Sequence, residues 1–205
     1  MNQTRRAFTD LQPLRRADLP RDTVALARFL IGTLLVRERG GHVLSARIVE
    51  TEAYMPDDAS SHAYRGLTER NRSMFGERGH AYVYFIYGSW FCLNVSAERP
   101  NVGAAVLVRA AEAIAGIETM QQLRGGVAER DLLRGPGRLC AALDVDRALD
   151  GIDLCRPGPL IVASGRRRAP IGESVRIGLT REAHRVLRFY ERGSPHVSGP
   201  ARINR

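Results

Sequence analysis

The chain has 205 residues and a hydrophobic content of 44%, enough to bury one sizeable core. It carries 31 Lys and Arg residues against 22 Asp and Glu residues, and the resulting formal charge of +9 favours a polyanionic partner. Three cysteines without CxxC spacing argue against a disulfide framework or structural zinc, and no apolar segment is long enough to suggest a secretory signal or a membrane span.

These features predict a single domain over residues 1–205 in a reducing cytoplasm, with residues 1–20 as a flexible N-terminal arm. A helix is predicted over residues 23–31, because Asp22 can cap an apolar face that weakens at Gly32. Residues 37–41 are typical of a turn. Residues 43–52 alternate as an extended strand, so that Glu50 and Glu52 are predicted to lie on one face.

Residues 55–79 are polar and interrupted by glycine, which is typical of loops. Two β-favouring runs follow at residues 81–87 and 90–96, and Gly88-Ser89 between them is typical of a two-residue hairpin loop. Farther along, the patterns predict a strand over residues 104–109, a helix over 112–123, a short helix over 139–143, and strands over 175–179 and 186–190.

The two glutamates, with Asp57, Asp58 and His62 in the following loop, form the densest cluster of chemically capable side chains. Taken from their spacing alone, these residues fit three interpretations. They could be a structural carboxylate pair bound to arginines, a site for a hard metal ion such as magnesium or manganese, or a general base with an orienting neighbour. Spacing alone favours the structural pair over the other two by roughly two to one.

The hairpin gathers much of the chain's modest aromatic content. Tyr82 and Tyr84 are predicted to share one face, while Val83 and Phe85 share the other, so that one set can pack the core and the other can meet a ligand. Tyr87 is placed at the tip, where an aromatic side chain of a basic protein can wedge between base pairs. Ordinary sheet packing is the simpler interpretation of any one of these residues.

Several motifs, taken together and in order, resemble one known family. They are Ile48 to Tyr54 (IVETEAY), Thr68 to Phe75, Tyr82 to Gly88, Cys92 to Asn94, Val106 to Ala110, Gly135 to Cys140, Arg176 to Gly178, and Leu187 to Pro195. They closely resemble the alkyladenine (3-methyladenine) DNA glycosylase family of the mammalian alkylpurine type, in a short bacterial form. The resemblance spans most of the chain.

This resemblance implies a DNA repair enzyme that flips alkylated or deaminated purines out of double-stranded DNA. Its substrates would belong to the class of 3-methyladenine, 7-methylguanine, hypoxanthine and ethenoadenine. By the same resemblance Glu52 deprotonates a water held with the help of the Arg109 side chain and the main-chain carbonyl of Ile177, and Glu50 becomes a supporting residue.

The resemblance also assigns the substrate pocket. Tyr54, His62 and Tyr84 are expected to line the pocket for the flipped base, Tyr87 to fill the gap left in the duplex, and Asn94 to oppose the amino group of normal guanine. Ser89 departs from the family pattern, because a larger residue stands beside the wedge in the mammalian form.

The expected protein is therefore a monomeric, monofunctional N-glycosylase of α+β class. Its fold is a curved, mostly antiparallel sheet flanked by helices, with a protruding β-hairpin, and it is expected to need no metal or redox cofactor. The chain contains no lysine, which argues against a lysine Schiff base and the strand nicking that follows from one. Two alternatives stay open: a metal-dependent nuclease using Glu50, Glu52, Asp57 and His62, and a noncatalytic DNA-binding module.

Overall fold

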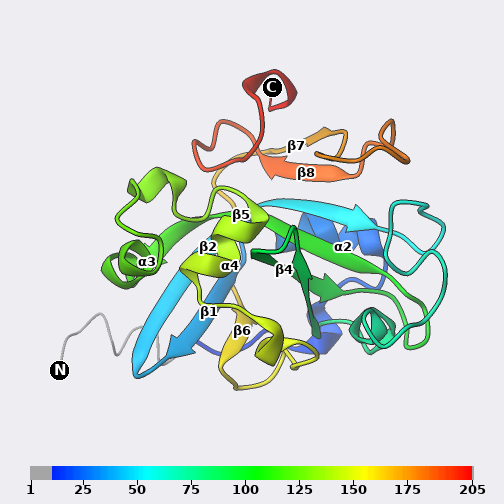
Figure 1. Cartoon of the computed structure of the whole chain (residues 1–205), viewed down its shortest axis with the longest axis horizontal. Coiled ribbons are helices and arrows are strands. Elements are labelled where there is room, and N and C mark those ends of the chain that lie inside the picture. Colours follow the sequence, from blue (N-terminus) through cyan, green and yellow to red (C-terminus); the bar gives the residue numbers. More distant parts are fainter. Residues whose placement is uncertain (1–10, 205) are drawn as a thin grey trace.

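The computed structural model describes residues 11–204 and has the predicted α+β architecture (Figure 1). The strands are β1 (Leu34–Arg39), β2 (His42–Tyr54), β3 (Ala81–Ile86), β4 (Trp90–Ser96), β5 (Ala105–Ala115), β6 (Leu160–Ala163), β7 (Ile171–Ser174) and β8 (Arg188–Glu191). The helices are α2 (Thr23–Leu30), α3 (Ile117–Leu123) and α4 (Pro136–Ala142), with 3₁₀ turns η1 (Arg16–Asp18), η2 (Arg72–Phe75), η3 (Glu129–Asp131), η4 (Arg147–Leu149) and η5 (Ala201–Ile203).

The strands form one antiparallel sheet of eight, in which six follow the order β3-β4-β5-β2-β1-β6. The long strand β2 organises the rest, because one of its edges pairs first with β1 and then, over residues 50–52, with β8. Strand β7 extends the sheet beyond β8. Residues 50–52 of β2 therefore lie between β5 and β8, in the interior of the sheet.

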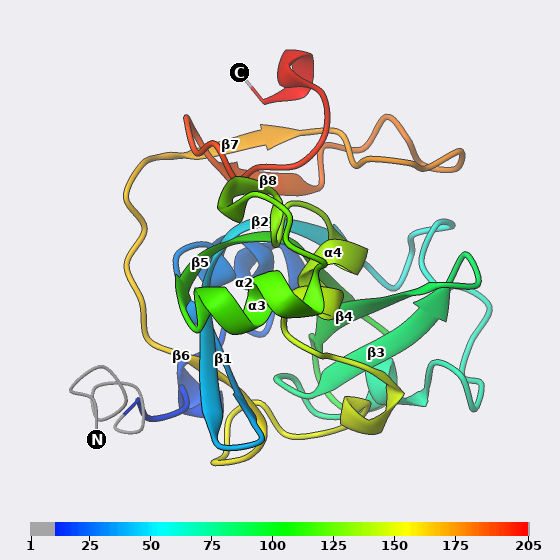
Figure 2. The ribbon, with the colours of Figure 1, turned by 60° about the vertical axis from the view of Figure 1, so that its left-hand side comes forward.

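Helices cover the sheet from both sides: in Figure 2, α3 and α4 lie in front of β2 and β5, and α2 lies behind them. Helix α2 begins as predicted, because the side chain of Asp22 accepts a hydrogen bond of 2.7 Å from the amide of Ala25. Its apolar face places Leu26 and Leu30 in the main core, where both are fully buried. Burying one leucine side chain contributes about 1.5–3 kcal/mol, so this face fixes the helix on the sheet.

Four predicted elements need correction. Residues 112–115 continue β5 instead of starting a helix, since they pair with β2, and Gly116 with a φ of 75° separates them from α3. Residues 37–39 belong to β1, which leaves only Gly40 and Gly41 in the turn. The strand predicted at 175–179 lies instead at Ile171–Ser174. The hairpin loop has three residues, because Tyr87 itself has left the strand with a φ of 53°.

The predicted N-terminal arm falls only partly within the described residues, since residues 1–10 lie outside them. Pro13 and Leu14 lie along β6, where the amide of Leu14 donates a hydrogen bond of 2.8 Å to the carbonyl of Val162. Among residues 11–204, no helix combines the length and the apolar character that crossing a membrane requires.

Candidate active site

Glu50 and Glu52 lie on the same face of β2, as the two-residue period of a strand requires, and both side chains are completely buried. Buried carboxylates are costly unless they are paired and hydrogen-bonded. Each glutamate has such partners, but the two sets of partners differ. This difference separates the chemical roles that the two carboxylates can have.

Glu52 is surrounded by three groups that also line a cavity. Its Oε2 accepts hydrogen bonds from the hydroxyl of Tyr54 at 3.0 Å and from Nη1 of Arg109 at 3.2 Å. Its Oε1 accepts one from the main-chain amide of Ile177 at 2.8 Å. This contact uses the amide of Ile177, whereas the role predicted for its carbonyl is to help hold the water, so the two roles concern different atoms of one residue. The carboxylate therefore lies directly behind the cavity wall.

Glu50 belongs to a network that faces the C-terminal segment instead. Its Oε1 accepts from Nε of Arg188 at 2.6 Å and from the hydroxyl of Ser198 at 3.0 Å, and its Oε2 accepts from the amide of Ser198 at 2.6 Å. Arg188 is itself fully buried and also donates to Asn204 and to the carbonyl of Ile203. Glu50 thus ties β8 and residues 198–204 to the centre of the sheet.

Arg109 on β5 joins the two carboxylates. Its Nε donates to Glu50 at 3.1 Å, and its Nη1 donates to Glu52. Burial alone lowers the pKa of Arg109, but the charges of Glu52 and Glu50 outweigh that effect and raise the pKa above its ordinary value. Arg109 is therefore a permanent cation shared by the two glutamates, and Arg188 provides the second positive charge beside Glu50.

The cavity in front of this cluster has a volume of about 330 Å³. Seven of the eight predicted site residues line it: Tyr54, His62, Tyr84, Tyr87, Asn94, Arg109 and Ile177. The eighth, Glu52, is covered by its three hydrogen-bond partners. The volume lies in the range of pockets that bind small organic molecules, about 300–1,000 Å³. The structure thus brings all eight residues together, although they come from four separate parts of the chain.

Aromatic rings form one wall of the cavity. The ring centroids of His62 and Tyr84 are 4.5 Å apart at an angle of 74°, and those of Tyr82 and Tyr84 are 5.3 Å apart. Nδ1 of His62 lies 2.9 Å from the hydroxyl of Tyr82. Burial raises the pKa of Tyr82 to about 12, so its hydroxyl stays protonated at neutral pH. A flat ligand can pack against rings that are held in this way.

Asn94 lies at the base of the same wall. Its Nδ2 donates a hydrogen bond of 3.0 Å to the carbonyl of Tyr82, the residue opposite it in the β3–β4 pairing. This bond fixes the orientation of the amide. Tyr84 has Cys92 as its cross-strand partner, and burial raises the pKa of both side chains. Neutral groups therefore make up this part of the lining.

His62 makes the stability of the protein depend on pH. Burial first, and then the charge of Arg70, hold the pKa of His62 below its ordinary value of 6.5. Below that pH the unfolded chain binds a proton at this ring while the folded ring stays neutral, so stability must fall as the pH falls toward the lowered pKa. We expect the free energy of unfolding, measured in urea, to decrease more for the wild type than for His62→Gln between about pH 7 and pH 5. A difference between the two proteins that stays constant over this range would contradict the prediction.

Tyr87 has the opposite environment, since 83% of its side chain is exposed at the hairpin tip. Figure 2 shows the β3–β4 hairpin on the side of the molecule opposite the β6–β7 connection, with α4 lying against β4. Its positive φ is unusual for a tyrosine and directs the chain through the three-residue loop. An exposed aromatic ring beside a cavity is available to contact a ligand.

The site also contains residues that are absent from the predicted set, and three of them contact its predicted members. Tyr82 lines the cavity beside Tyr84, and the alternation along β3 is the sequence signal that indicates this position. The guanidinium of Arg176 lies 4.6 Å from the ring centre of Tyr54 and forms a buried ion pair with Asp58. Ser198, near the C-terminus, donates hydrogen bonds to Glu50 from its amide and its hydroxyl. No local pattern links Arg176 or Ser198 to β2.

The side chains required by the nuclease alternative do not form a metal-binding group. Arginine side chains contact both Glu50 and Glu52, and Asp57 instead pairs with Arg185 at 3.5 Å. Within residues 11–204, no three His, Cys, Asp or Glu side chains gather closely enough to hold a metal ion. The geometry favours an arginine-balanced carboxylate over a carboxylate metal site.

Comparisons with known proteins agree on one family. Residues 17–195 match the family model described as methylpurine-DNA glycosylase (MPG). A protein of Mesorhizobium japonicum is 57% identical over 93% of this chain and 92% of its own length, and one of Paraburkholderia phytofirmans is 50% identical over 93% and 90%. A third, from Methanocella arvoryzae, is 45% identical over 88% and 95%. All three bear the name "Putative 3-methyladenine DNA glycosylase".

Proposed function

The chain belongs to the methylpurine-DNA glycosylase family, and we propose that it flips a damaged purine out of double-stranded DNA into the 330 Å³ cavity and hydrolyses its N-glycosidic bond with a water activated by Glu52. Membership makes the protein a DNA glycosylase that acts in base excision repair, a hydrolase of N-glycosyl bonds. One observation carries the rest of the proposal. A buried carboxylate is contacted by three residues that all line an aromatic cavity.

Base flipping is energetically reasonable for this cavity. Unpairing and unstacking one nucleotide costs a few kcal/mol, and less at a damaged pair. Stacking on an aromatic wall returns about 1–3 kcal/mol per base. The wall formed by Tyr84, His62 and Tyr82 can supply this stacking. A purine that carries positive charge after alkylation gains further attraction from tyrosine faces.

The water would lie at the cavity wall in front of Glu52. Arg109 and Ile177 each touch Glu52 and each line the cavity, so a water bound beside them is within reach of the carboxylate. Glu52 accepts a proton from this water, the oxygen forms a bond to the anomeric carbon, and the bond to the purine nitrogen breaks. The electron pair of that bond leaves with the purine. A cationic alkylpurine departs as a neutral base, and we therefore expect such purines to be released more readily than neutral lesions.

The fate of the DNA strand tests the reaction class. A duplex with one damaged purine is incubated with the protein and a chelator, and the strands are then separated with and without alkali. We expect an intact strand that breaks only after alkali, because an abasic site remains. Direct cleavage that the chelator abolishes would support the nuclease alternative, and an unchanged duplex would support the binding module.

Tyr87 provides a test of base flipping that is separate from catalysis. We expect Tyr87→Ser to weaken binding to a damaged duplex by about 1–3 kcal/mol, because the ring no longer fills the gap left by the flipped base. Fluorescence anisotropy with labelled DNA measures this loss. Val186→Ser, which removes another exposed apolar side chain, serves as the control. Equal affinities of wild type and Tyr87→Ser would contradict the wedge role.

A further inference from the structure

The β3–β4 hairpin has a second face, turned away from the cavity, that the proposed function leaves unused. Tyr82 and Tyr84 point from β3 into the cavity, so Val83 and Phe85 point to the opposite side. Phe85 lies directly across from Phe91 on β4, with ring centroids 5.1 Å apart. The two rings line an open groove of about 590 Å³ together with Arg70 and Arg147. We call these four residues the outer patch.

Among residues 11–204, the 3₁₀ turn η4 covers the base of this face. This turn packs on β3, and the side chain of Asp150 accepts a hydrogen bond of 2.9 Å from the amide of Val83. Val83 is fully buried. Toward the tip Phe85 keeps 48% of its surface exposed. Phe91 beside it is partly buried and packs on the main core, so Phe85 is the exposed edge of an apolar surface that continues into the fold. Exposing such an aromatic ring to water is unfavourable unless a partner covers it. The outer patch therefore has the character of a contact surface.

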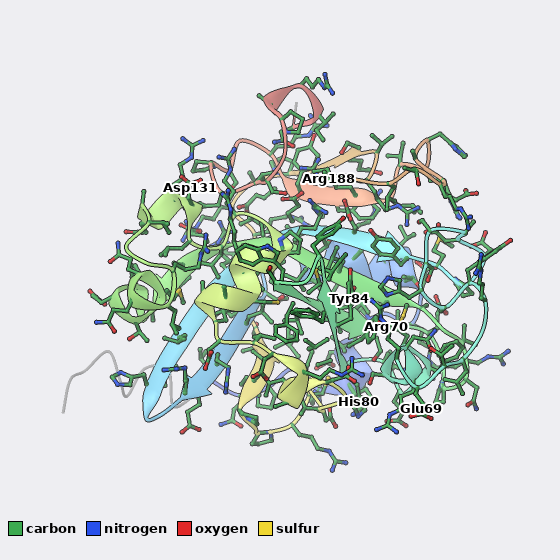
Figure 3. All side chains as sticks on the ribbon, in the orientation of Figure 1. Glu69, Arg70, His80, Tyr84, Asp131 and Arg188 are labelled. Carbon is green, nitrogen blue, oxygen red and sulfur yellow. The ribbon has the colours of Figure 1, made fainter. Side chains whose placement is uncertain are left out.

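Two guanidinium groups are fixed beside these rings. Strand β3 is at the edge of the sheet, so its outward carbonyls are free to accept from side chains. Arg147 donates to the carbonyl of Val83 at 2.7 Å and lies 3.5 Å from Asp150, while Arg70 donates to the carbonyl of Phe85 at 3.3 Å. Figure 3 shows Arg70 near Tyr84, beside the hairpin. Because a carbonyl has no net charge, this contact places Arg70 without neutralising it.

Aromatic rings between cations suit a strand of nucleic acid, since the rings can pack on a base or a deoxyribose and the guanidinium groups can bind phosphates. The location of the outer patch relative to Tyr87 indicates which of the two DNA strands it contacts. Phe85 precedes Tyr87 by two residues, which is at most about 7 Å of chain, or no more than roughly two base-pair steps. The cavity on the inner face receives a nucleotide of the damaged strand. The outer face is then directed toward the other strand.

We propose that the outer patch binds the sugar-phosphate backbone of the undamaged strand, opposite the lesion. Arg70 and Arg147 contact its phosphates, and Phe85 with Phe91 packs against the sugar or base between them. This inference rests on the proposed function, because it requires Tyr87 to enter a duplex. The hairpin would then hold both strands, one on each face, while the damaged base is outside the helix.

Comparison of two forms of the same DNA tests this proposal. The probe is a labelled strand with a stable abasic-site analogue, used alone or annealed to its complement, and its dissociation constant is measured by anisotropy at several salt concentrations. We expect Phe85→Ser combined with Arg70→Gln to weaken binding of the duplex by about 10-fold or more, and binding of the single strand by about 2-fold or less. The slope of log affinity against log salt for the duplex should fall by about one.

The controls separate the patch from general charge and from folding. Arg166→Gln removes an exposed arginine from the β6–β7 connection, which Figure 2 shows on the side away from the hairpin, and it should affect both DNA forms alike. Arg70→Gln alone should show a smaller loss with the same preference for duplex. Unfolding midpoints report whether each variant is folded.

Two results would overturn the inference: unchanged affinity of the double variant for the duplex, or equal losses for single strand and duplex. Failure of the proposed function is distinguishable from both. In that case the wild type itself would release no purine from damaged duplexes, whatever the outer patch binds.

Discussion

Glu52→Gln is expected to lower the rate of purine release by about 10²–10⁴-fold, the usual contribution of a general base, while binding to damaged DNA is largely kept. Glutamine has nearly the shape of glutamate and can still accept from the amide of Ile177. It cannot take a proton from water, and it removes the negative charge beside Arg109. Single-turnover measurement of base release, with enzyme in excess over DNA, isolates the chemical step from product release.

Asp57→Asn is the matched control for this variant. It also removes one carboxylate, from the segment that follows β2, but the side chain of Asp57 is 69% exposed and pairs with Arg185 rather than with the cluster around Glu52. We expect Asp57→Asn to release purine at the wild-type rate. A rate for Glu52→Gln within about 3-fold of the wild type would contradict the role of Glu52 as general base.

Arg188→Met is expected to destabilise the protein by about 3–5 kcal/mol, the cost of removing one partner from a buried ion pair. Both Arg188 and Glu50 are completely buried, and methionine offers no donor to Glu50, Asn204 or the carbonyl of Ile203. Glu50 then keeps a charge in the interior with fewer partners. Urea unfolding of the wild type and the variant measures the difference.

An exposed ion pair, Arg72 with Glu69, serves as the control for the buried pair of Arg188 and Glu50. Arg72→Met breaks an ion pair with Glu69 in which the two side chains are 70% and 94% exposed, so we expect a change of at most about 1 kcal/mol. Combining Arg188→Met with Glu50→Gln should cost less than the sum of the single variants, because the unpaired charge disappears. A loss below about 1 kcal/mol for Arg188→Met would show that the buried network does not support the fold.

Much of the site follows from short-range patterns and from the family resemblance. The two-residue period of β2 and β3 places Glu50 with Glu52 and Tyr82 with Tyr84, as observed. Asp22 caps α2 at the predicted residue. These features depend on neighbours within a few residues, which is why they can be inferred from sequence.

Other features depend on segments that meet only in the fold. Residues 112–115 contain alanine and glutamate, which favour a helix, but pairing with β2 makes them a strand. Ser198 and Arg188 reach Glu50 from a distance of well over one hundred residues. The amide of Ile177 faces Glu52 because residues 176–179 form an irregular segment beside the cavity, and no periodicity describes such a segment. Spacing alone therefore left the two glutamates equivalent, whereas their partners distinguish them.

The most direct test of the central claim is the amount of free purine released from damaged duplexes. Duplexes that each carry 3-methyladenine, 7-methylguanine, hypoxanthine or ethenoadenine are incubated with the wild-type protein in chelator, and the released base is separated and quantified. We predict free base from at least the alkylated purines, no release from undamaged duplex, and no detectable release by Glu52→Gln in the same time. Release from none of the four lesions, or equal release by wild type and Glu52→Gln, would contradict hydrolysis at this cavity through Glu52.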